Sequence, residues 1–389
     1  MSKENELVIP GKKYEKVERE PPKGFATAND FFESLFHDKE MIWMGQNTNH
    51  LHDDTISSSM ARCALSKEYC KYPPLEGFTK LKNLILEDLE LEGLKVLLTS
   101  GATESLYLTM HGLIAKEDNV VLSDPGYLII GTFADRFADE VRYVPIYNEE
   151  CDYKLTPELI RENIDENTKM IILVDPLNPL GSSYTEEEIK EFAEIAIENN
   201  LFVLHDVTYR DFAEKHTLVA KYAPKHTLTI YSFSKIFGMA GLRIGAVVAD
   251  EEVIEVLKNV VVNDLGVNVV SQTGAIAGLE SKDRWEDYIR TTTLNNQKLI
   301  KECVDEIDGV FLPVYPSQAN MMAIDLSGAG INPKDMAEYL LDKKIFTREG
   351  EYTSKNFGQN YLRVSFSIPE EDVKYFCKEF KEAVEVLRK

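Results

Sequence analysis

Apolar strands alternate with amphipathic helices from about residue 94, and this alternation constrains the fold more than any other feature. Each strand is an almost continuous run of β-branched and aliphatic residues, and a helix-length segment separates most of them from the next. Strands of this kind are typical of parallel sheets that helices cover on both faces. The strands are expected at residues 94–100, 119–124, 141–146, 169–175, 201–206, 228–233 and 243–249. The sequence therefore predicts an α/β fold with a mostly parallel, doubly wound sheet.

The pattern changes after about residue 275, where a long helical segment at residues 283–307 precedes shorter apolar runs. This mixture is typical of an α+β arrangement. We expect three parts: residues 1–45 as an N-terminal arm that contributes to a small domain, residues 46–278 as the large domain, and residues 279–389 as the small C-terminal domain. A chain of 389 residues is long enough for two domains with separate cores.

The chain is strongly acidic, with 66 acidic against 43 basic residues and a net charge of −23. Nucleic acids and anionic membranes bind basic surfaces, so neither partner is expected. No apolar run reaches the roughly 18 residues that cross a bilayer, and the charged segment at residues 1–24 does not resemble a secretory signal. The five cysteines are scattered without metal-ligand spacing, so we expect reduced thiols, a cytoplasmic protein and no bound metal.

Polar residues follow several of the predicted strands directly. Thr103, Asn178, Asp206 and Lys235 each lie just after an apolar run. In open α/β sheets, ligands bind beyond the carboxyl ends of the strands, and these residues would meet there. The sequence therefore predicts a ligand site at this edge of the sheet.

The segment after the strand at residues 228–233 carries the most specific chemistry. Lys235 lies among small and apolar residues, where lost hydration makes an amine partly neutral, as an imine-forming lysine must be. Ser232, Ser234 and Arg243 are donors suited to a phosphate, because arginine offers two parallel N–H groups. These residues alone leave open a surface lysine in a flexible turn.

Four short motifs resemble one enzyme family. S-x-S-K followed by G-x-R-x-G occupies residues 232–245, D-x-x-Y occupies residues 206–209, an N-P pair begins at Asn178, and R-V-S-F begins at Arg363. Taken in their order along the chain, from Asn178 to Arg363, they are similar to the motifs of the pyridoxal-phosphate-dependent class I/II aminotransferases of the aspartate aminotransferase type. The resemblance extends over residues 44–367. It implies fold type I, pyridoxal 5'-phosphate as cofactor, and a homodimer with active sites at the subunit interface.

The resemblance also implies roles around the cofactor ring. Lys235 would hold the cofactor aldehyde as a Schiff base, and Asp206 would keep the pyridine nitrogen protonated so that the ring accepts electrons. Tyr209 and Asn178 would donate to the phenolate oxygen, and Tyr127 would stack on the ring. Taken alone, a tyrosine at position 127 would more often be a core residue, and Asp206 could equally be a helix cap or turn residue.

A second group of residues would bind two anions. The cofactor phosphate would lie at a helix N-terminus, where free N–H groups and the helix dipole favour an anion. Its ligands by resemblance are Ala102, Thr103, Ser232, Ser234 and Arg243, with Tyr72 reaching from the second subunit. The substrate carboxylate would meet Arg363, because an arginine within an apolar strand is costly without an anion. Gly45 and Asn178 would complete the substrate side, and a structural salt bridge of Arg363 stays open as the alternative.

The loop around Asn178 departs twice from the family pattern N-P-x-N-P-T-G. Asp175 replaces the first asparagine, and Leu180 replaces the threonine. The asparagine expected to contact the cofactor is kept. The departures leave the hydrogen bonds of this loop and the shape of the pocket open.

The expected activity is transfer of an amino group from an L-amino acid to a 2-oxo acid with ping-pong kinetics, in which Lys235 moves a proton from the substrate Cα. A lyase or decarboxylase on the same fold would use the same cofactor residues, so it stays the alternative. A DNA-binding regulator would need a basic helix-turn-helix region, which the short arm before residue 40 does not resemble. No motif singles out the substrate, although the polar loop at residues 46–52 favours a polar or anionic side chain.

Overall fold

The computed structural model describes residue 21 and residues 24–51, 54–263 and 265–388. The chain divides into two compact units, residues 1–41 and residues 42–389. In the described part of the first unit, helix α1 (Ala28–His37) begins where the Thr27 side chain accepts a hydrogen bond from the Asp30 N–H.

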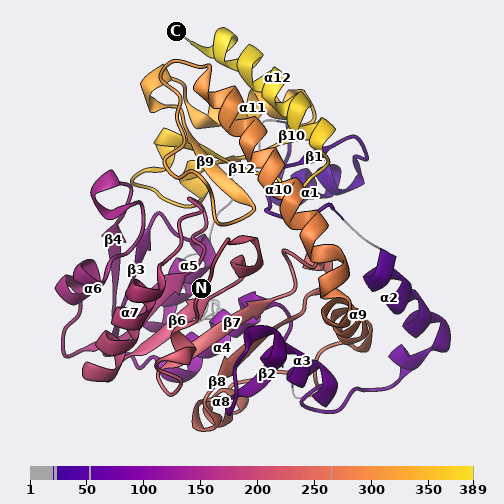
Figure 1. Ribbon diagram of the computed structural model, residues 1–389, viewed down its shortest axis with the longest axis vertical. Helices are drawn as coiled ribbons and strands as arrows, with labels where there is room; N and C mark the ends of the chain where they lie inside the picture. The colour runs from indigo at the N-terminus through magenta and orange to yellow at the C-terminus, as the bar shows by residue number, and fades with distance from the viewer. Residues whose placement is uncertain (1–20, 22–23, 52–53, 264, 389) are drawn as a thin grey trace, which may run out of the picture. The chain divides into compact units, whose positions relative to one another are not determined.

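A mixed seven-stranded sheet in the order β2-β8-β7-β6-β5-β3-β4 organises the described part of the second unit (Figure 1). β8 runs antiparallel to both of its neighbours, and the other strands of this sheet are parallel to one another. The strands are β2 (Lys95–Thr99), β3 (Asn119–Asp124), β4 (Glu140–Pro145), β5 (Thr168–Val174), β6 (Phe202–Asp206), β7 (Thr227–Ser232) and β8 (Gly245–Ala249). The predicted mostly parallel sheet is confirmed. The strand expected from residue 243 begins two residues later, because Arg243 has a left-handed backbone with φ of 50°.

Both faces of this sheet are buried against helices. Successive residues of β2 alternate between two cores: Leu97 packs in one, and Val96 and Leu98 pack in the other. The helices that follow or precede these strands are α2 (Asp54–Ser66), α3 (Thr79–Leu89), α4 (Ala102–Leu113), α5 (Leu128–Phe137), α6 (Pro157–Asn163), α7 (Glu186–Glu198), α8 (Glu251–Lys258) and α9 (Val269–Glu280). Burial on both faces explains why the central strands are continuously apolar.

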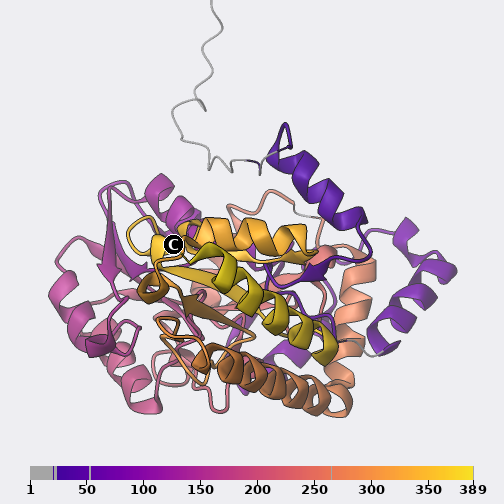
Figure 2. The same ribbon diagram turned by 90° about the horizontal axis from the view of Figure 1, so that it is seen from above.

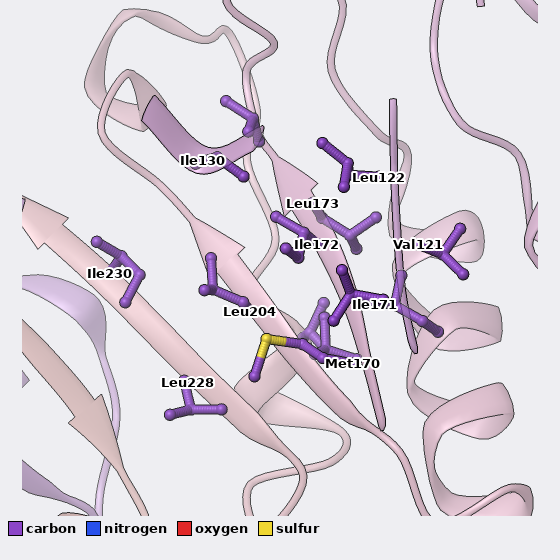
Figure 3. Packing of buried hydrophobic residues seen from close by; sticks show 14 of the residues in the cluster. Val121, Leu122, Ile130, Met170, Ile171, Ile172, Leu173, Leu204, Leu228 and Ile230 are labelled. Atoms are coloured by element: carbon purple, nitrogen blue, oxygen red, sulfur yellow. The ribbon is translucent and has the colours of Figure 1, made fainter. Parts of the chain in front are cut away.

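The larger core is built from neighbouring strands in register. Ile172 of β5, Leu204 of β6 and Leu228 of β7 are successive partners across the sheet, and Figure 3 shows their side chains with Ile130 of α5 in the same packed cluster. Close packing of this kind makes strand positions rigid. The loops at the strand ends therefore start from fixed points.

The C-terminal part forms smaller sheets with a core of their own. β9 (Met321–Asp325), β11 (Arg348–Glu349) and β12 (Tyr361–Ser365) form an antiparallel sheet in the order β11-β12-β9, and β1 (Ile42–Trp43) pairs with β10 (Ile345–Phe346). These strands pack with α10 (Lys282–Asp305), α11 (Pro333–Asp342) and α12 (Glu370–Leu387). Figure 2 shows α11 and α12 lying together in orange and yellow. The division predicted at residues 45 and 278 stays a prediction.

Within the described ranges, no helix combines the length and the apolar character that crossing a bilayer requires.

Candidate functional site

The candidate site lies at the carboxyl edge of the large sheet. β5, β6 and β7 all end there because they are parallel, and β8 begins there because it runs the other way. Ser232 at the end of β7 pairs with Gly245, which also pairs with Thr99 at the end of β2. The register thus brings the loops carrying Asp206 and Lys235 to the start of α4.

The N-terminus of α4 lies against the Arg243 guanidinium. A Cβ at Gly101, which has φ of +87°, would lie 2.5 Å from Arg243 Nη2, and a Cβ at Gly245 would lie 2.5 Å from the Ala102 nitrogen. Both positions therefore need glycine. The first N–H groups of α4, including that of Thr103, and the guanidinium form a place that favours an anion.

Lys235 lies just after β7, beside the two serines of its motif. Its Nζ donates to the Gln46 carbonyl over 2.9 Å and lies 5.6 Å from the centre of the Tyr209 ring. Ser232 is buried, and its Oγ accepts from the Ser234 N–H over 3.2 Å. The amine thus has a neutral acceptor as its hydrogen-bond partner.

The pKa of Lys235 is lowered to about 7. Burial is the largest cause, repulsion by Arg363 is next, attraction by Asp206 acts in the opposite direction, and Arg243 adds a smaller repulsion. Three cationic groups therefore converge here, although the whole chain has a net charge of −23. Such a constellation fits anionic ligands and a lysine that must be neutral to react.

We expect the Lys235 amine of the cofactor-free protein to titrate near pH 7, because its folded-state pKa is about 7 against 10.5 for an ordinary lysine. Below pH 7 both the folded and the unfolded chain carry this proton. Between pH 7 and about 10.5 only the unfolded chain carries it, so the free energy of unfolding rises with pH in that window. The measurement is the pH dependence of chemical unfolding. The wild type should show this rise and Lys235→Met should lack it; equal slopes would contradict the assignment.

Asp206 is a buried carboxylate at the end of β6. Both hydrogen bonds from Thr208, one from its N–H over 3.1 Å and one from its hydroxyl over 2.5 Å, go to Oδ1. Burial raises the pKa of Asp206, while the bonds from Thr208 and the charge of Lys235 oppose that shift. The second carboxylate oxygen is therefore available for a further donor.

Tyr209 is buried three residues after Asp206, and Asn47 holds its hydroxyl. Asn47 Nδ2 donates to Tyr209 Oη over 3.1 Å, so the hydroxyl proton is free to be donated elsewhere. Burial raises the pKa of Tyr209, and the bond from Asn47 and the charge of Arg363 oppose the rise. Asn47 is 1% exposed, and its Oδ1 has no hydrogen-bond partner among the described residues. The sequence pointed to the surrounding polar loop and missed Asn47 itself.

Arg363 in β12 connects the C-terminal part to this edge. Its Nη1 donates to Asn178 Oδ1 over 2.9 Å, and its Nη2 donates to the Gly45 carbonyl over 2.6 Å. The side chain is buried, and no carboxylate of the described ranges forms an ion pair with it. The structural salt bridge left open above is therefore absent from the described part of the chain.

Tyr127 lies directly before α5 and next to Thr103 at the start of α4. Burial, the largest cause, raises its pKa to about 12, and a hydrogen bond with Thr103 opposes the rise. Tyr127 therefore belongs to the same group of side chains as the start of α4.

Two further residues join the site from the C-terminal part. Arg348 of β11 pairs directly with Arg363 of β12, and both guanidinium groups lie over the Tyr352 ring, at 4.6 and 5.8 Å from its centre. No sequence signal pointed to Arg348 or Tyr352, because their proximity depends on the pairing of two strands.

Tyr72 is the predicted site residue that does not join the others within one chain. Its side chain is 79% exposed. The segment around it lies near Gly266, since a Cβ there would be 3.0 Å from the Pro74 carbonyl oxygen. Exposed apolar residues accompany it on these two segments, namely Leu65, Tyr69, Leu75, Val262 and Leu265.

Residues 39–380 match the family of class I and II aminotransferases. The chain belongs to this family. Class I and II aminotransferases depend on pyridoxal phosphate. The predicted resemblance and fold class are thereby confirmed.

Curated relatives of this aminotransferase cover nearly its full length. The aspartate aminotransferase of Pyrococcus horikoshii is 27% identical over 92% of this chain and 94% of its own length. Histidinol-phosphate aminotransferase 2 of Archaeoglobus fulgidus is 26% identical over 84% of this chain and 92% of its own length. The two relatives are named for different substrates, so they leave the substrate of this chain open.

Solved structures share the fold of this aminotransferase. The aromatic aminotransferase of Pyrococcus horikoshii superposes with a TM-score of 0.79 at 22% identity, covering 92% of this chain and 98% of the other. A double mutant of the Thermus thermophilus aspartate aminotransferase gives 0.80 at 22% identity, with coverage of 93% and 97%. At this identity the similarity concerns the fold alone.

Proposed function

We propose that this aminotransferase binds pyridoxal 5'-phosphate on Lys235 and moves an amino group from an L-amino acid to a 2-oxo acid. One observation carries the proposal: a lysine whose pKa is lowered to about 7 lies between a buried carboxylate, Asp206, and two arginines, Arg243 and Arg363, that have no carboxylate partner among the described residues. This arrangement needs a ligand with anionic groups at both ends.

The residues present fit the cofactor. Gly101 and Gly245 leave the first N–H groups of α4 and the Arg243 guanidinium open to a phosphate. Ser232, Ser234 and Thr103 would add hydroxyl donors there. Lys235 would hold the aldehyde, Asp206 would face the ring nitrogen, Tyr209 and Asn178 would donate to the ring oxygen, and Tyr127 would stack on the ring. The Asn47 bond to Tyr209 supports this orientation, because it leaves the tyrosine proton free.

Bound pyridoxal phosphate supplies an aldehyde that takes up the amino group and a ring that accepts electrons from the substrate Cα. The protein supplies the rest. Arg363 fixes the substrate carboxylate and so orients the Cα–H bond. Lys235 would remove that proton as a neutral amine and deliver it to C4′, the carbon that carried the cofactor aldehyde, which a pKa of about 7 permits at neutral pH. Asp206 would lie against the ring nitrogen and, as a carboxylate, stabilise its protonated form.

The test is a half-reaction. The cofactor-loaded protein is mixed with single L-amino acids without an acceptor, and its visible absorbance is followed. The proposal expects conversion to the aminated cofactor and full recovery after a 2-oxo acid is added. Release of ammonia or carbon dioxide without any 2-oxo acid would instead indicate the lyase or decarboxylase alternative.

We also propose a homodimer in which Tyr72 serves the partner's site. The exposed apolar residues around Tyr72 form a surface suited to a second copy of the chain. Mixing Lys235→Ala and Tyr72→Ala subunits tests this directly. A hybrid should regain about half of the wild-type activity per dimer, because one of its two sites then has both native residues. If Tyr72 serves its own subunit, both hybrid sites are damaged and activity stays at the level of the variants.

A further inference from the structure

Four hydrogen-bond donors converge on the Asp175 carboxylate, one residue after β5. Oδ1 accepts from the Ser183 hydroxyl over 2.5 Å and from the Tyr184 N–H over 3.4 Å. Oδ2 lies 3.3 Å from His205 Nε2 and 2.9 Å from His216 Nε2. Asp175 is fully buried. Burial acts to raise its pKa, but the two histidines outweigh burial and hold the pKa below its usual value.

The hydrogen bonds fix which imidazole nitrogens carry protons. His205 Nδ1 accepts from the Val219 N–H over 3.4 Å, so the proton of the neutral ring lies on Nε2, which faces Asp175. His216 Nε2 also lies 3.2 Å from the Asp175 carbonyl oxygen, so it faces two acceptors and donates. Both imidazoles therefore present N–H groups to the same carboxylate oxygen.

An amide at position 175 cannot satisfy these four donors. Its NH₂ group would face either the two imidazole N–H groups or the Ser183 and Tyr184 donors, and a buried unsatisfied donor is costly. A metal ion does not fit this cluster either, because His205 would have to bind it through Nε2, the nitrogen that carries the proton. Only a carboxylate completes the cluster, which accounts for aspartate in place of the asparagine of the family pattern.

The Asp175 carboxylate closes the loop that carries Asn178. The loop leaves the sheet at Asp175 and returns at Ser183 and Tyr184, which both bond that carboxylate. The Leu177 N–H donates to the Ser182 carbonyl over 2.7 Å within it. On the other side, the Asp175 N–H donates to the Asp206 carbonyl over 2.9 Å. The Asp175 carboxylate, through His205, and the Asp175 N–H, through the Asp206 carbonyl, thus tie the loop that carries Asn178 to β6.

We propose that Asp175, His205 and His216 form a positioning cluster that sets the place of Asn178, and through its bond the place of the Arg363 guanidinium. The cluster touches neither substrate nor cofactor. It acts by holding both ends of one loop, so its loss displaces the acceptor that orients Arg363. This inference rests on the proposed function, in which Arg363 binds the substrate carboxylate.

The test is a double-mutant cycle. Asp175→Asn should raise the KM for the amino acid and lower kcat/KM by about tenfold to a hundredfold, with a smaller effect on kcat, because a misplaced orienting group impairs binding of the carboxylate first. His216→Gln alone should lower kcat/KM less, since the new amide can still donate to Asp175. The double variant should recover part of the loss, because the amide oxygen introduced at position 216 can then accept from the NH₂ group introduced at position 175. His226→Gln, which alters a histidine bonded to the Leu201 carbonyl, is the control and should leave KM unchanged.

A second readout does not depend on activity. Imidazole nitrogen NMR of the cofactor-free protein should show protonated Nε2 in both His205 and His216 and no change on adding Zn²⁺. An unchanged KM in Asp175→Asn, a loss of activity in that variant that unfolding fully explains, or an unprotonated Nε2 would overturn the inference. An inactive wild type with the expected NMR signals would overturn the proposed function and leave the geometry of the cluster intact.

Discussion

Replacing Lys235 by alanine is expected to lower kcat by about 10⁴-fold or more, because in the proposed mechanism the variant loses both the amine that holds the cofactor and the base that moves the Cα proton. The lowered pKa of about 7 is what makes this amine effective at neutral pH. Steady-state turnover and the visible absorbance of the bound cofactor should both change. Added methylamine should restore part of the rate, since a small amine can replace the missing base.

Lys258→Ala is the control for Lys235→Ala. Lys258 lies in α8, which follows β8 at the edge of the sheet opposite the candidate site. It pairs with Glu76 and Glu255 over 2.7 Å, so its amine stays cationic. This variant should keep full turnover. Wild-type turnover in Lys235→Ala, or no rescue by methylamine together with normal folding, would contradict the role of Lys235.

Replacing Arg363 by methionine is expected to lower kcat/KM by about 10³-fold without lowering stability. The guanidinium is buried, has no carboxylate partner among the described residues, and leaves its Nε without a hydrogen bond. A buried charge in this state is costly in the free protein and becomes favourable when a substrate carboxylate meets it. The measurements are kcat/KM for the amino acid and the midpoint of chemical unfolding.

Arg210 gives a matched control, because it is a largely buried arginine, with its side chain 15% exposed, that has carboxylate partners. It forms ion pairs with Asp88 and, over 3.2 Å, with Asp211. Arg210→Met leaves these two carboxylates with Lys282, over 2.7 Å, as their remaining cation, so it should destabilise the fold by about 3 kcal/mol, the lower end for a broken buried pair. The two variants should therefore show opposite patterns: Arg363→Met loses function, and Arg210→Met loses stability. A large loss of stability in Arg363→Met would make Arg363 structural.

The fold, and the position of Asp206 and Lys235 at one edge of the sheet, could be predicted because the strands before these residues set where they lie. Asp206 and Lys235 follow continuous apolar strands, and parallel strands must end at one edge. Gly101 and Gly245 could be interpreted only with coordinates, since their need for glycine comes from the Arg243 and Ala102 atoms beside them.

Other contacts join segments that lie far apart along the chain, and no pattern in the sequence indicates which of these segments meet. Asn47 reaches Tyr209 across 162 residues, and Arg348 meets Arg363 through strand pairing. The departure at Asp175 was visible in the sequence, but its reason lies in two histidines 30 and 41 residues away. Tyr72 cannot be placed from one chain because its predicted target lies in another.

The most direct test of the central claim is to reduce the cofactor-loaded protein with borohydride, which makes the link between an amine and the cofactor aldehyde permanent, and to map the modified peptide by mass spectrometry. The account predicts one modified residue, Lys235. Modification of another lysine, or of none in a protein that still shows the cofactor's visible absorbance, would contradict it.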